Sequence, residues 1–229
     1  MDKGTRGELL DRLAGAIESV TASHPLRVAV DGPPAAGKTT LADELALVLR
    51  TQGREVIRAS AESFHLPRAQ RYRRGEFSPE ANYHDSFDYD TLRRVLLDPL
   101  GPSGDRRYQH AVYDLATDTA LSAPVTTARA DAVLLLDGVF LLRPELIDRW
   151  DLSIFVSAAF GRIMDRARIR DLARVGSAAE VERRFRTRYI PGQKLYFATA
   201  RPADNADIVV HNDEPGRPAW EVRIPSRDA

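Results

Sequence analysis

One short segment places two glycines, a lysine and a threonine at a spacing suited to phosphate chemistry. It matches the pattern G-x-x-x-x-G-K-[ST] at every fixed position. The glycines allow backbone angles that turn the loop amides toward phosphate oxygens, and a helix that follows would add its positive N-terminal end. The lysine is a compact charge for the β- and γ-phosphates, and the threonine hydroxyl suits Mg²⁺. We therefore predict a site for Mg-ATP formed by Gly32, Pro33, Pro34, Ala35, Ala36, Gly37, Lys38, Thr39 and Thr40.

Two carboxylates follow predicted strands and could complete this site. Asp137 comes directly after the apolar run 132–136, at the edge where α/β sheets bind ligands, and we expect it to hold Mg²⁺ with Thr39. Glu62 follows a predicted strand at 55–59 and could orient a substrate hydroxyl and accept its proton. The alternatives are an Asp137 that only caps the turn before Gly138, and a Glu62 that is only a solvated loop residue.

Aromatic and histidine residues are concentrated in a loop-rich stretch, residues 64–113. Such residues in a loop indicate either a small-molecule pocket or the packing of an insertion against the core. The candidates for contact with an acceptor include Phe64, His65, Tyr83 and Tyr113. The histidine spacing predicts no metal site here.

Arginines crowd a predicted helix at 162–175. Arg166, Arg170 and Arg174 are four residues apart, so a continuous helix would place them on one face, where guanidinium groups could bind the transferring phosphate. The alternative is a solvated basic face paired with Asp165 and Asp171. We expect residues 162–190 to form a lid that excludes water, with Arg170 as a catalytic residue.

Strand and helix patterns alternate along the chain, which indicates one α/β domain over residues 1–229, with a mostly parallel sheet and helices on both faces. We expect residues 60–87 to be loop-rich and residues 107–115 and 124–128 to form a hairpin-like excursion, within an acceptor region of about 60–130. The predicted strands are 27–30, 55–59, 132–136, 152–156, 208–210 and 220–224. The predicted helices are 9–20, 39–50, 90–97, 162–175, 178–189 and 191–200.

Composition narrows the classes of protein. The 33 basic and 33 acidic residues cancel, which gives no support for a nucleic-acid or membrane partner. The chain has no cysteine, which excludes disulfides and cysteine-ligated metals. Residues 1–8 are charged, unlike a signal peptide, and the longest apolar run, 132–136, is too short for a membrane span. We therefore expect a cytoplasmic protein.

The ordered motifs together resemble the uridine kinase family over roughly residues 26–211. These are the phosphate loop, Ser60-Ala61-Glu62-Ser63-Phe64, Asp85-Ser86-Phe87-Asp88, Val112-Tyr113-Asp114, the apolar strand with Asp137-Gly138, and Arg166 to Arg170-Asp171. The resemblance implies a P-loop fold with a five-stranded parallel core, a β-hairpin over the acceptor site, an arginine-bearing lid and phosphorylation of a sugar hydroxyl. It implies that Asp85 binds substrate and that Glu62 takes the place of the family's aspartate base.

Four positions depart from the family pattern, namely Glu62, Asn82, Asp118 and the run Arg174-Val175-Gly176-Ser177. The leading hypothesis is therefore a kinase that phosphorylates a small hydroxylated metabolite, which is either a nucleoside or another compound. Two alternatives are a nucleotide-driven switch or regulatory ATPase without an acceptor, and a binding module without catalysis. Assembly as a homo-oligomer is left open.

Overall fold

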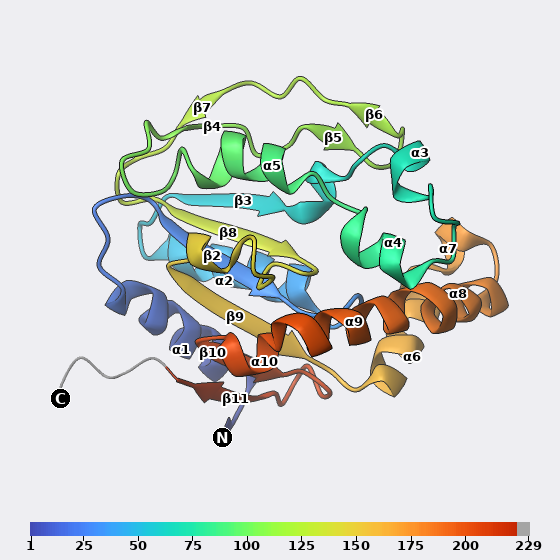
Figure 1. Ribbon diagram of the computed structural model, residues 1–229. Coiled ribbons are helices and arrows are strands. Elements are labelled where there is room, and N and C mark those ends of the chain that lie inside the picture. Colours follow the sequence, from blue (N-terminus) through green and yellow to red (C-terminus); the bar gives the residue numbers. More distant parts are fainter. Residues whose placement is uncertain (224–229) are drawn as a thin grey trace.

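A seven-stranded sheet in the order β1-β11-β10-β9-β2-β8-β3 forms the centre of the computed structural model, which describes residues 1–223 (Figure 1). The five strands from β10 to β3 are parallel, so the predicted parallel core is confirmed. Strands β11 and β1 add antiparallel pairs at one edge. The predicted strand at 220–224 is found at 219–222, and Ile224 lies outside the described residues. The strands are β1 (Asp2–Lys3), β2 (Leu26–Asp31), β3 (Val56–Ser60), β8 (Val133–Gly138), β9 (Leu152–Ser157), β10 (Ile208–His211) and β11 (Ala219–Val222).

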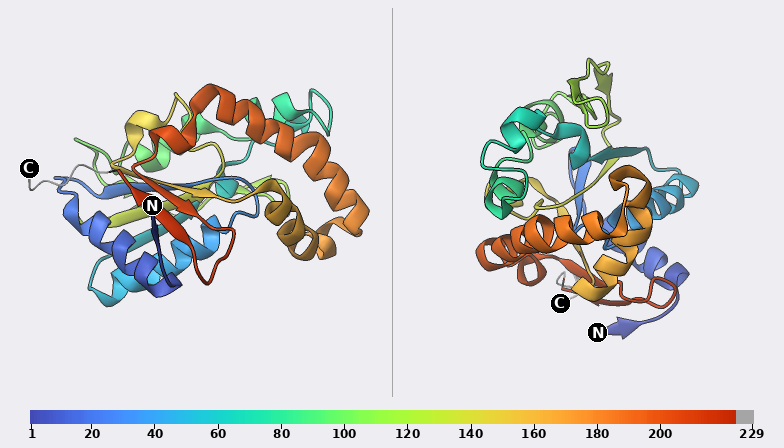
Figure 2. Two further views of the ribbon diagram at one scale, coloured as in Figure 1. Left: turned by 90° about the horizontal axis from the view of Figure 1, so that it is seen from below. Right: turned by 90° about the vertical axis from the view of Figure 1, so that its right-hand side faces the viewer.

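Helices cover both faces of the sheet (Figure 2). Every residue of β2 and β8 is buried, as expected for parallel strands between two helical layers. On one face, α1 (Arg6–Ser19) and α2 (Lys38–Thr51) contribute leucines at helical spacing to a common core. On the other face lie α5 (Tyr89–Leu92), α9 (Ile190–Ala200) and the short α10 (Pro202–Asn205).

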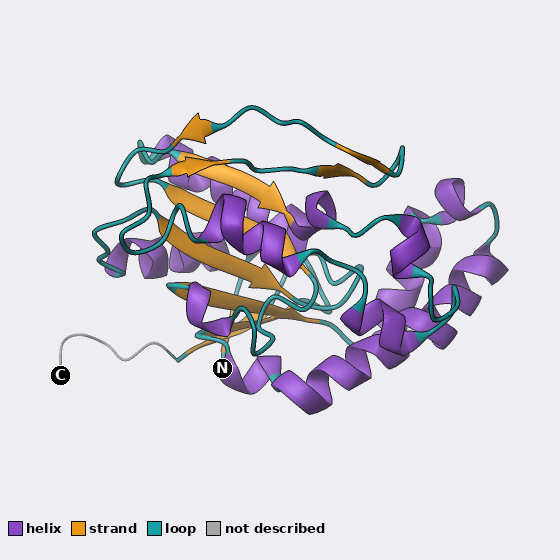
Figure 3. Ribbon diagram, turned by 45° about the horizontal axis from the view of Figure 1, so that its top comes forward, coloured by secondary structure: helices purple, strands orange, loops and turns teal. Residues whose placement is uncertain are grey.

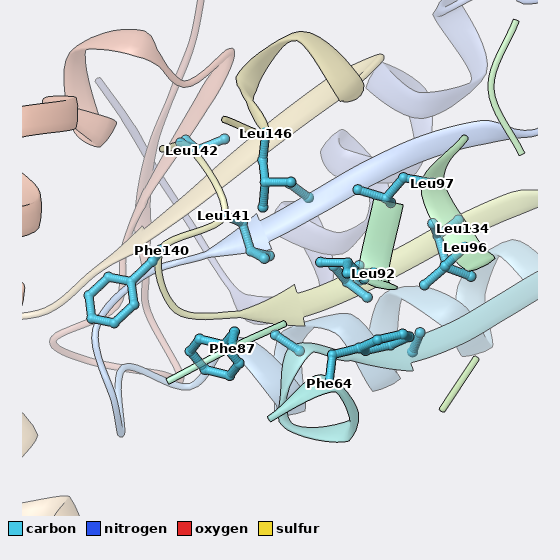
Figure 4. Packing of buried hydrophobic residues seen from close by; sticks show 14 of the residues in the cluster. Phe64, Phe87, Leu92, Leu96, Leu97, Leu134, Phe140, Leu141, Leu142 and Leu146 are labelled. Atoms are coloured by element: carbon cyan, nitrogen blue, oxygen red, sulfur yellow. The ribbon is translucent and has the colours of Figure 1, made fainter. Parts of the chain in front are cut away.

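The second core fixes the segment that follows β3. Phe64 ends the single 3₁₀ turn η1 (Ala61–Phe64) and packs with Phe87, Leu92, Leu134 and Phe140 (Figure 4). Because Phe64 is fully buried, the turn that carries Glu62 is held firmly against the sheet.

The acceptor region, about residues 60–130, is more regular than predicted. Residues 60–87 contain two short helices, and the second begins with a Ser78 cap and Pro79 in its first turn, a start signal that the prediction missed. The hairpin-like excursion is confirmed as two short antiparallel ladders above the sheet, β4 with β7 and β5 with β6 (Figure 3). The elements are α3 (Arg68–Arg71), α4 (Pro79–His84), η2 (Arg93–Leu97), β4 (Arg107–Tyr108), β5 (Tyr113–Asp114), β6 (Thr119–Ala120), β7 (Thr126–Thr127) and η3 (Ile147–Arg149).

The arginine-rich segment forms a lid beyond the carboxyl ends of the strands (Figure 1). It comprises α6 (Phe160–Arg170), α7 (Leu172–Val175), α8 (Ala178–Arg184) and the π-helical turn η4 (Phe185–Tyr189), which runs into α9. The continuous helix predicted for 162–175 is wrong, because α6 ends at Asp171 and Gly176, with φ 93°, then turns the chain. The lid has its own small core, against which Ala35 of the phosphate loop packs. In the described chain, no helix is both long and apolar enough to cross a lipid bilayer.

Candidate active site

Sheet register brings the predicted phosphate and metal residues to one edge. Strand β8 lies between β2 and β3, with Gly138 opposite Asp31 and Asp137 opposite Ser60. The loop after β2, the end of β8 and the turn after β3 therefore begin side by side. This is the edge at which open parallel sheets bind ligands.

Close backbone approach explains both glycines of the phosphate loop. A Cβ on Gly32, which has φ 149°, would lie 2.2 Å from the carbonyl oxygen of Val156. A Cβ on Gly37, which has φ 97°, would lie 2.5 Å from Nδ2 of Asn212. That amide of Asn212 donates to the carbonyl of Ala36 at 2.7 Å. The loop is thus held from outside by the ends of β9 and β10, and larger residues would displace it.

Lys38 lies at the centre of the site and is only 8 % exposed. Its Nζ donates to the carbonyl of Pro33 at 2.8 Å, so the side chain folds back across the loop. Burial lowers the pKa of Lys38 to about 8, and the nearby carboxylates of Asp31 and Asp137 oppose that shift. A triphosphate would add negative charge next to this ammonium and favour its protonated form.

Asp31 is a buried carboxylate at this edge of the sheet that the sequence analysis missed. It ends β2, is fully buried, and accepts hydrogen bonds from the Tyr196 hydroxyl at 2.5 Å and the Leu141 amide at 3.3 Å. Burial raises the pKa of Asp31, and the Lys38 charge works in the opposite direction. A carboxylate at the end of an otherwise apolar strand was the available signal, the same one that identified Asp137.

Thr39 and Asp137 offer two hard oxygen ligands side by side. The Thr39 hydroxyl donates to Oδ2 of Asp137 at 2.6 Å, and Arg58 donates to the other carboxylate oxygen at 2.9 Å. Among the described residues there is no cluster of three or more histidine, cysteine or carboxylate ligands. Mg²⁺ typically takes one or two protein oxygens and fills its shell with phosphates and water, so this pair fits Mg²⁺ accompanied by a nucleotide.

The three predicted catalytic residues lie on elements that meet at this edge of the sheet, namely the phosphate loop, the turn after β3 and helix α6. Glu62 is exposed on η1, where its backbone amide donates to the Ser60 hydroxyl oxygen at 3.3 Å. The charges of Arg170 and Glu62 both act on the pKa of Lys38. Arg170 donates two bonds to Asp171, at 2.8 and 2.9 Å; these raise the pKa of Arg170, and the Glu62 charge adds to the effect. Residues from the loop, the turn after β3 and the lid therefore converge.

The other two lid arginines have different surroundings. Arg166 donates to the carbonyls of Ala36, Asn212 and Asp213, which ties α6 to the phosphate loop. Arg174 lies on α7, mostly exposed, with its guanidinium 3.5 Å from Asp171. The shared face predicted for Arg166, Arg170 and Arg174 is interrupted, and direct contact of Arg166 or Arg174 with nucleotide stays a prediction.

The predicted acceptor contacts divide into core and pocket residues. Phe64 is wholly enclosed and supports η1; its contact with an acceptor stays a prediction. Tyr83 is 4 % exposed and packs against Phe140 and Tyr196; its contact with an acceptor stays a prediction. The carboxylate of Asp85 is engaged by two arginines, Arg73 and Arg74.

His65 and Tyr113 each form a hydrogen bond with a polar partner. The His65 Nδ1 lies 2.9 Å from the carbonyl of Glu62, so this nitrogen carries the proton and donates it. Burial lowers the pKa of His65 to about 4, which keeps the ring neutral near pH 7. The Tyr113 hydroxyl donates to Asp118 at 2.5 Å, and Asp118 also accepts from Arg71 at 2.9 Å.

A well-formed hollow lies away from this edge of the sheet. A cavity of about 410 Å³ is lined by Pro33, the start of α6, and the ends of α9 and α10. It contains neither Lys38, Glu62 nor Asp137, and its lining is mainly apolar. We therefore locate the chemistry at the sheet edge and not in this cavity.

The parallel sheet, the phosphate loop and the arginine-bearing lid define a P-loop kinase fold. The chain belongs to the cytidylate kinase-like family, whose model matches residues 27–214. It is 26 % identical over 157 residues to uridine-cytidine kinase B of Dictyostelium discoideum, covering 69 % of this chain and 63 % of that protein. It thus spans less than two thirds of that relative's length. The predicted resemblance to uridine kinases is confirmed.

Solved structures show the same fold at low identity. A possible uridine kinase from Bacillus stearothermophilus superposes with a TM-score of 0.71 and 24 % identity, over 89 % of this chain and 97 % of that chain. D-glycerate 3-kinase from Cryptococcus neoformans gives a TM-score of 0.61 and 16 % identity, over 89 % and 94 % of the two chains. Phosphoribulokinase from Rhodobacter spheroides gives 0.55 and 18 %, over 82 % and 70 %. Relatives with different acceptors in their names share this architecture.

Proposed function

We propose that the protein transfers the γ-phosphoryl group of ATP to a hydroxyl of a small metabolite. The observation that carries this proposal is the convergence of Lys38, Glu62 and Arg170 at the edge where β2, β3 and β8 end. Phosphoryl transfer requires a cation that binds the phosphates and a carboxylate that orients the acceptor. It also requires a positive group, here a lid arginine, that stabilises the charge developing on the transferring phosphate.

Each residue has a role set by its position. The Lys38 ammonium and the amides of residues 32–40 other than the two prolines bind the phosphates, and Arg170 stabilises charge on the transferring group. The exposed Glu62 carboxylate orients the acceptor hydroxyl and takes its proton. A bond forms from that hydroxyl oxygen to the γ-phosphorus as the bond to the β–γ bridging oxygen breaks, and ADP leaves. Thr39 and Asp137 would hold Mg²⁺, which supplies charge neutralisation on the phosphate oxygens.

An acceptor screen tests the proposal. The purified full chain is incubated with Mg-ATP and a panel of nucleosides, sugars, sugar acids and sugar phosphates, with ADP release and product mass as readouts. We expect at least one acceptor to raise ADP release by about tenfold or more and to gain one phosphoryl group, as positioned transfer predicts. ATP turnover that is indifferent to the whole panel would indicate a nucleotide-driven switch and overturn the proposal.

A further inference from the structure

A buried arginine beside the candidate acceptor site lacks an ionic partner. Arg188 is the fourth residue of η4, with 4 % of its surface exposed. Its Nη1 donates to the carbonyl of Glu76 at 2.8 Å and, more weakly, to that of Ser78 at 3.4 Å. No carboxylate of the described residues forms an ion pair with it. Burying a guanidinium without an opposite charge is costly, so an arginine in this state indicates a partner supplied from outside the chain.

The neighbouring arginines, unlike Arg188, each form an ion pair with a carboxylate. Arg71 pairs with Asp118 at 2.9 Å, and Arg184 pairs with Glu76 at 2.9 Å. Glu76 therefore offers Arg188 only its backbone carbonyl, since its side chain is already engaged. Arg188 is the more deeply buried of these cations, and yet it is the one left without a carboxylate among the described residues.

The position of Arg188 connects it to the reacting end of the site. Its guanidinium lies 4.9 Å from the centre of the Tyr72 ring. Burial lowers the pKa of Arg188, and the nearby Arg71 charge lowers it further. The charges of Arg71 and Arg188 also act on His65, which donates to the backbone of Glu62. The Arg71 guanidinium lies 5.6 Å from the centre of the same Tyr72 ring, so the two arginines are neighbours in the region next to His65 and Glu62.

Two donor groups of Arg188 have no hydrogen-bond partner within residues 1–223. Nη1 makes both recorded hydrogen bonds, and Nε and Nη2 donate to no group in residues 1–223. Neither atom is sealed away from solvent without a partner. Parallel N–H groups of this kind match the two oxygens of a carboxylate or phosphate.

We propose that Arg188, assisted by Arg71, binds an oxyanion on the acceptor, so that the substrate is a hydroxylated metabolite carrying a carboxylate or phosphate group. The substrate places its hydroxyl at Glu62 and its anionic end at Arg188. This substrate class rests on the proposed kinase function, whereas the anion site itself does not, so the two can fail separately.

The first experiment measures anion binding without catalysis. The full chain is saturated with Mg²⁺ and a non-hydrolysable ATP analogue to fill the phosphate loop, and inorganic phosphate is then titrated by calorimetry. We expect one saturable site that Arg188→Gln weakens by at least about 30-fold, as expected for loss of a buried charged partner. Arg186→Gln, on the same turn but 67 % exposed, is the matched control and should change the affinity less than about twofold. No saturable binding, or equal binding by the Arg188 variant, would overturn the anion site.

The second experiment uses only the unmodified protein, so it remains decisive even if Arg188→Gln folds poorly. Matched acceptors are compared, glycerol with glycerate and ribose with ribose 5-phosphate. We expect kcat/KM to favour the charged member of at least one pair by about 100-fold, the effect of one desolvated charge pair. Transfer to neutral acceptors at equal or higher kcat/KM would overturn the proposed substrate class and leave the kinase function intact. Phosphate binding at Arg188 without transfer to any acceptor would instead overturn the kinase function.

Discussion

Two buried cations, Lys38 in the phosphate loop and Arg188 in the acceptor pocket, have opposite surroundings. Lys38 lies between Asp31 and Asp137, which offset the cost of burying its charge. Arg188 has carbonyl partners and a nearby guanidinium, which adds to that cost. The phosphate half of the site, around Lys38, thus has its own counter-charges, whereas the proposed acceptor half, around Arg188, has no carboxylate of residues 1–223 paired with that arginine. The difference indicates a general nucleotide site joined to a selective acceptor site.

Removing Lys38 should have the largest effect, because it is the one lysine in the phosphate loop. We expect Lys38→Ala to lower phosphoryl transfer by about 1,000-fold while the protein stays folded, since one preorganised charge at a transferring phosphate is worth that much. The measurement is ADP release with the best acceptor, with circular dichroism as the test of folding. Lys194→Ala, an exposed lysine on α9, should retain full activity. A Lys38 variant that transferred phosphate at the normal rate would contradict the whole assignment.

Removing the carboxylate of Glu62 tests the junction between the two halves. We expect Glu62→Gln to lower kcat by about 100- to 1,000-fold, the typical contribution of a positioned base, with little change in nucleotide affinity. Glu62→Asp, which keeps the charge on a shorter chain, should recover part of the rate. Equal rates for all three proteins in rapid-mixing experiments would exclude a proton-accepting role. If Glu62→Gln lowered nucleotide affinity and left kcat unchanged, Glu62 would instead belong to the nucleotide-binding part of the site.

The phosphate half could be predicted from the sequence because its residues are neighbours in the chain or follow strands of a parallel sheet. The loop, Asp137 and Glu62 needed only a local pattern and the rule that parallel strands end at one edge. Asp31 also ends a parallel strand, so the same rule could have found it, whereas its partner Tyr196, 165 residues away, could not be predicted. The lid could be located but not shaped, since the helix predicted for 162–175 is divided into α6 and α7.

The acceptor half was less predictable for a physical reason. Residue type indicated a pocket, but burial decides which rings line it, and Phe64 proved to be a core residue. Arg188 was one arginine among many in the lid, and no local pattern distinguishes it. What distinguishes it is that no carboxylate within residues 1–223 forms an ion pair with it, since that of Glu76 pairs with Arg184, and only the folded arrangement reveals this.

Raising the pH should weaken nucleotide binding at the phosphate loop without weakening anion binding at Arg188. The free protein loses the Lys38 proton near pH 8, whereas bound triphosphate favours the ammonium and raises that pKa. Nucleotide affinity should therefore be level below pH 7.5 and fall by up to about tenfold per pH unit above 8, with a proton taken up on binding. Titrations between pH 6.5 and 9.5, in buffers of different ionisation enthalpy, measure both effects. A flat affinity profile to pH 9.5 would contradict the pKa of Lys38.

The same pH series also tests whether anion binding at Arg188 is independent of nucleotide binding at Lys38. Arginine stays protonated throughout this range, and His65, with a pKa of about 4, stays neutral. Phosphate binding at Arg188 should therefore remain nearly constant once inorganic phosphate is fully ionised. If acceptor-site affinity fell together with nucleotide affinity above pH 8, Lys38 would serve both sites and the division into two halves would be wrong.

The smallest predicted effect concerns the support of the phosphate loop. The Asn212 side chain, 2 % exposed, donates to the Ala36 carbonyl at 2.7 Å, and Asn205 makes an equivalent bond to the Ala200 carbonyl at 2.8 Å far from the site. We expect each alanine substitution to lower the free energy of unfolding by about 1 kcal/mol, the usual net value of such a bond. Only Asn212→Ala should also weaken nucleotide binding, by about three- to tenfold, because it loosens a loop that must be rigid before the ligand arrives. Equal nucleotide affinities for the two variants would show that the loop does not depend on β10 for its shape. The phosphate half would then owe its preformed state to Lys38 and its carboxylates alone.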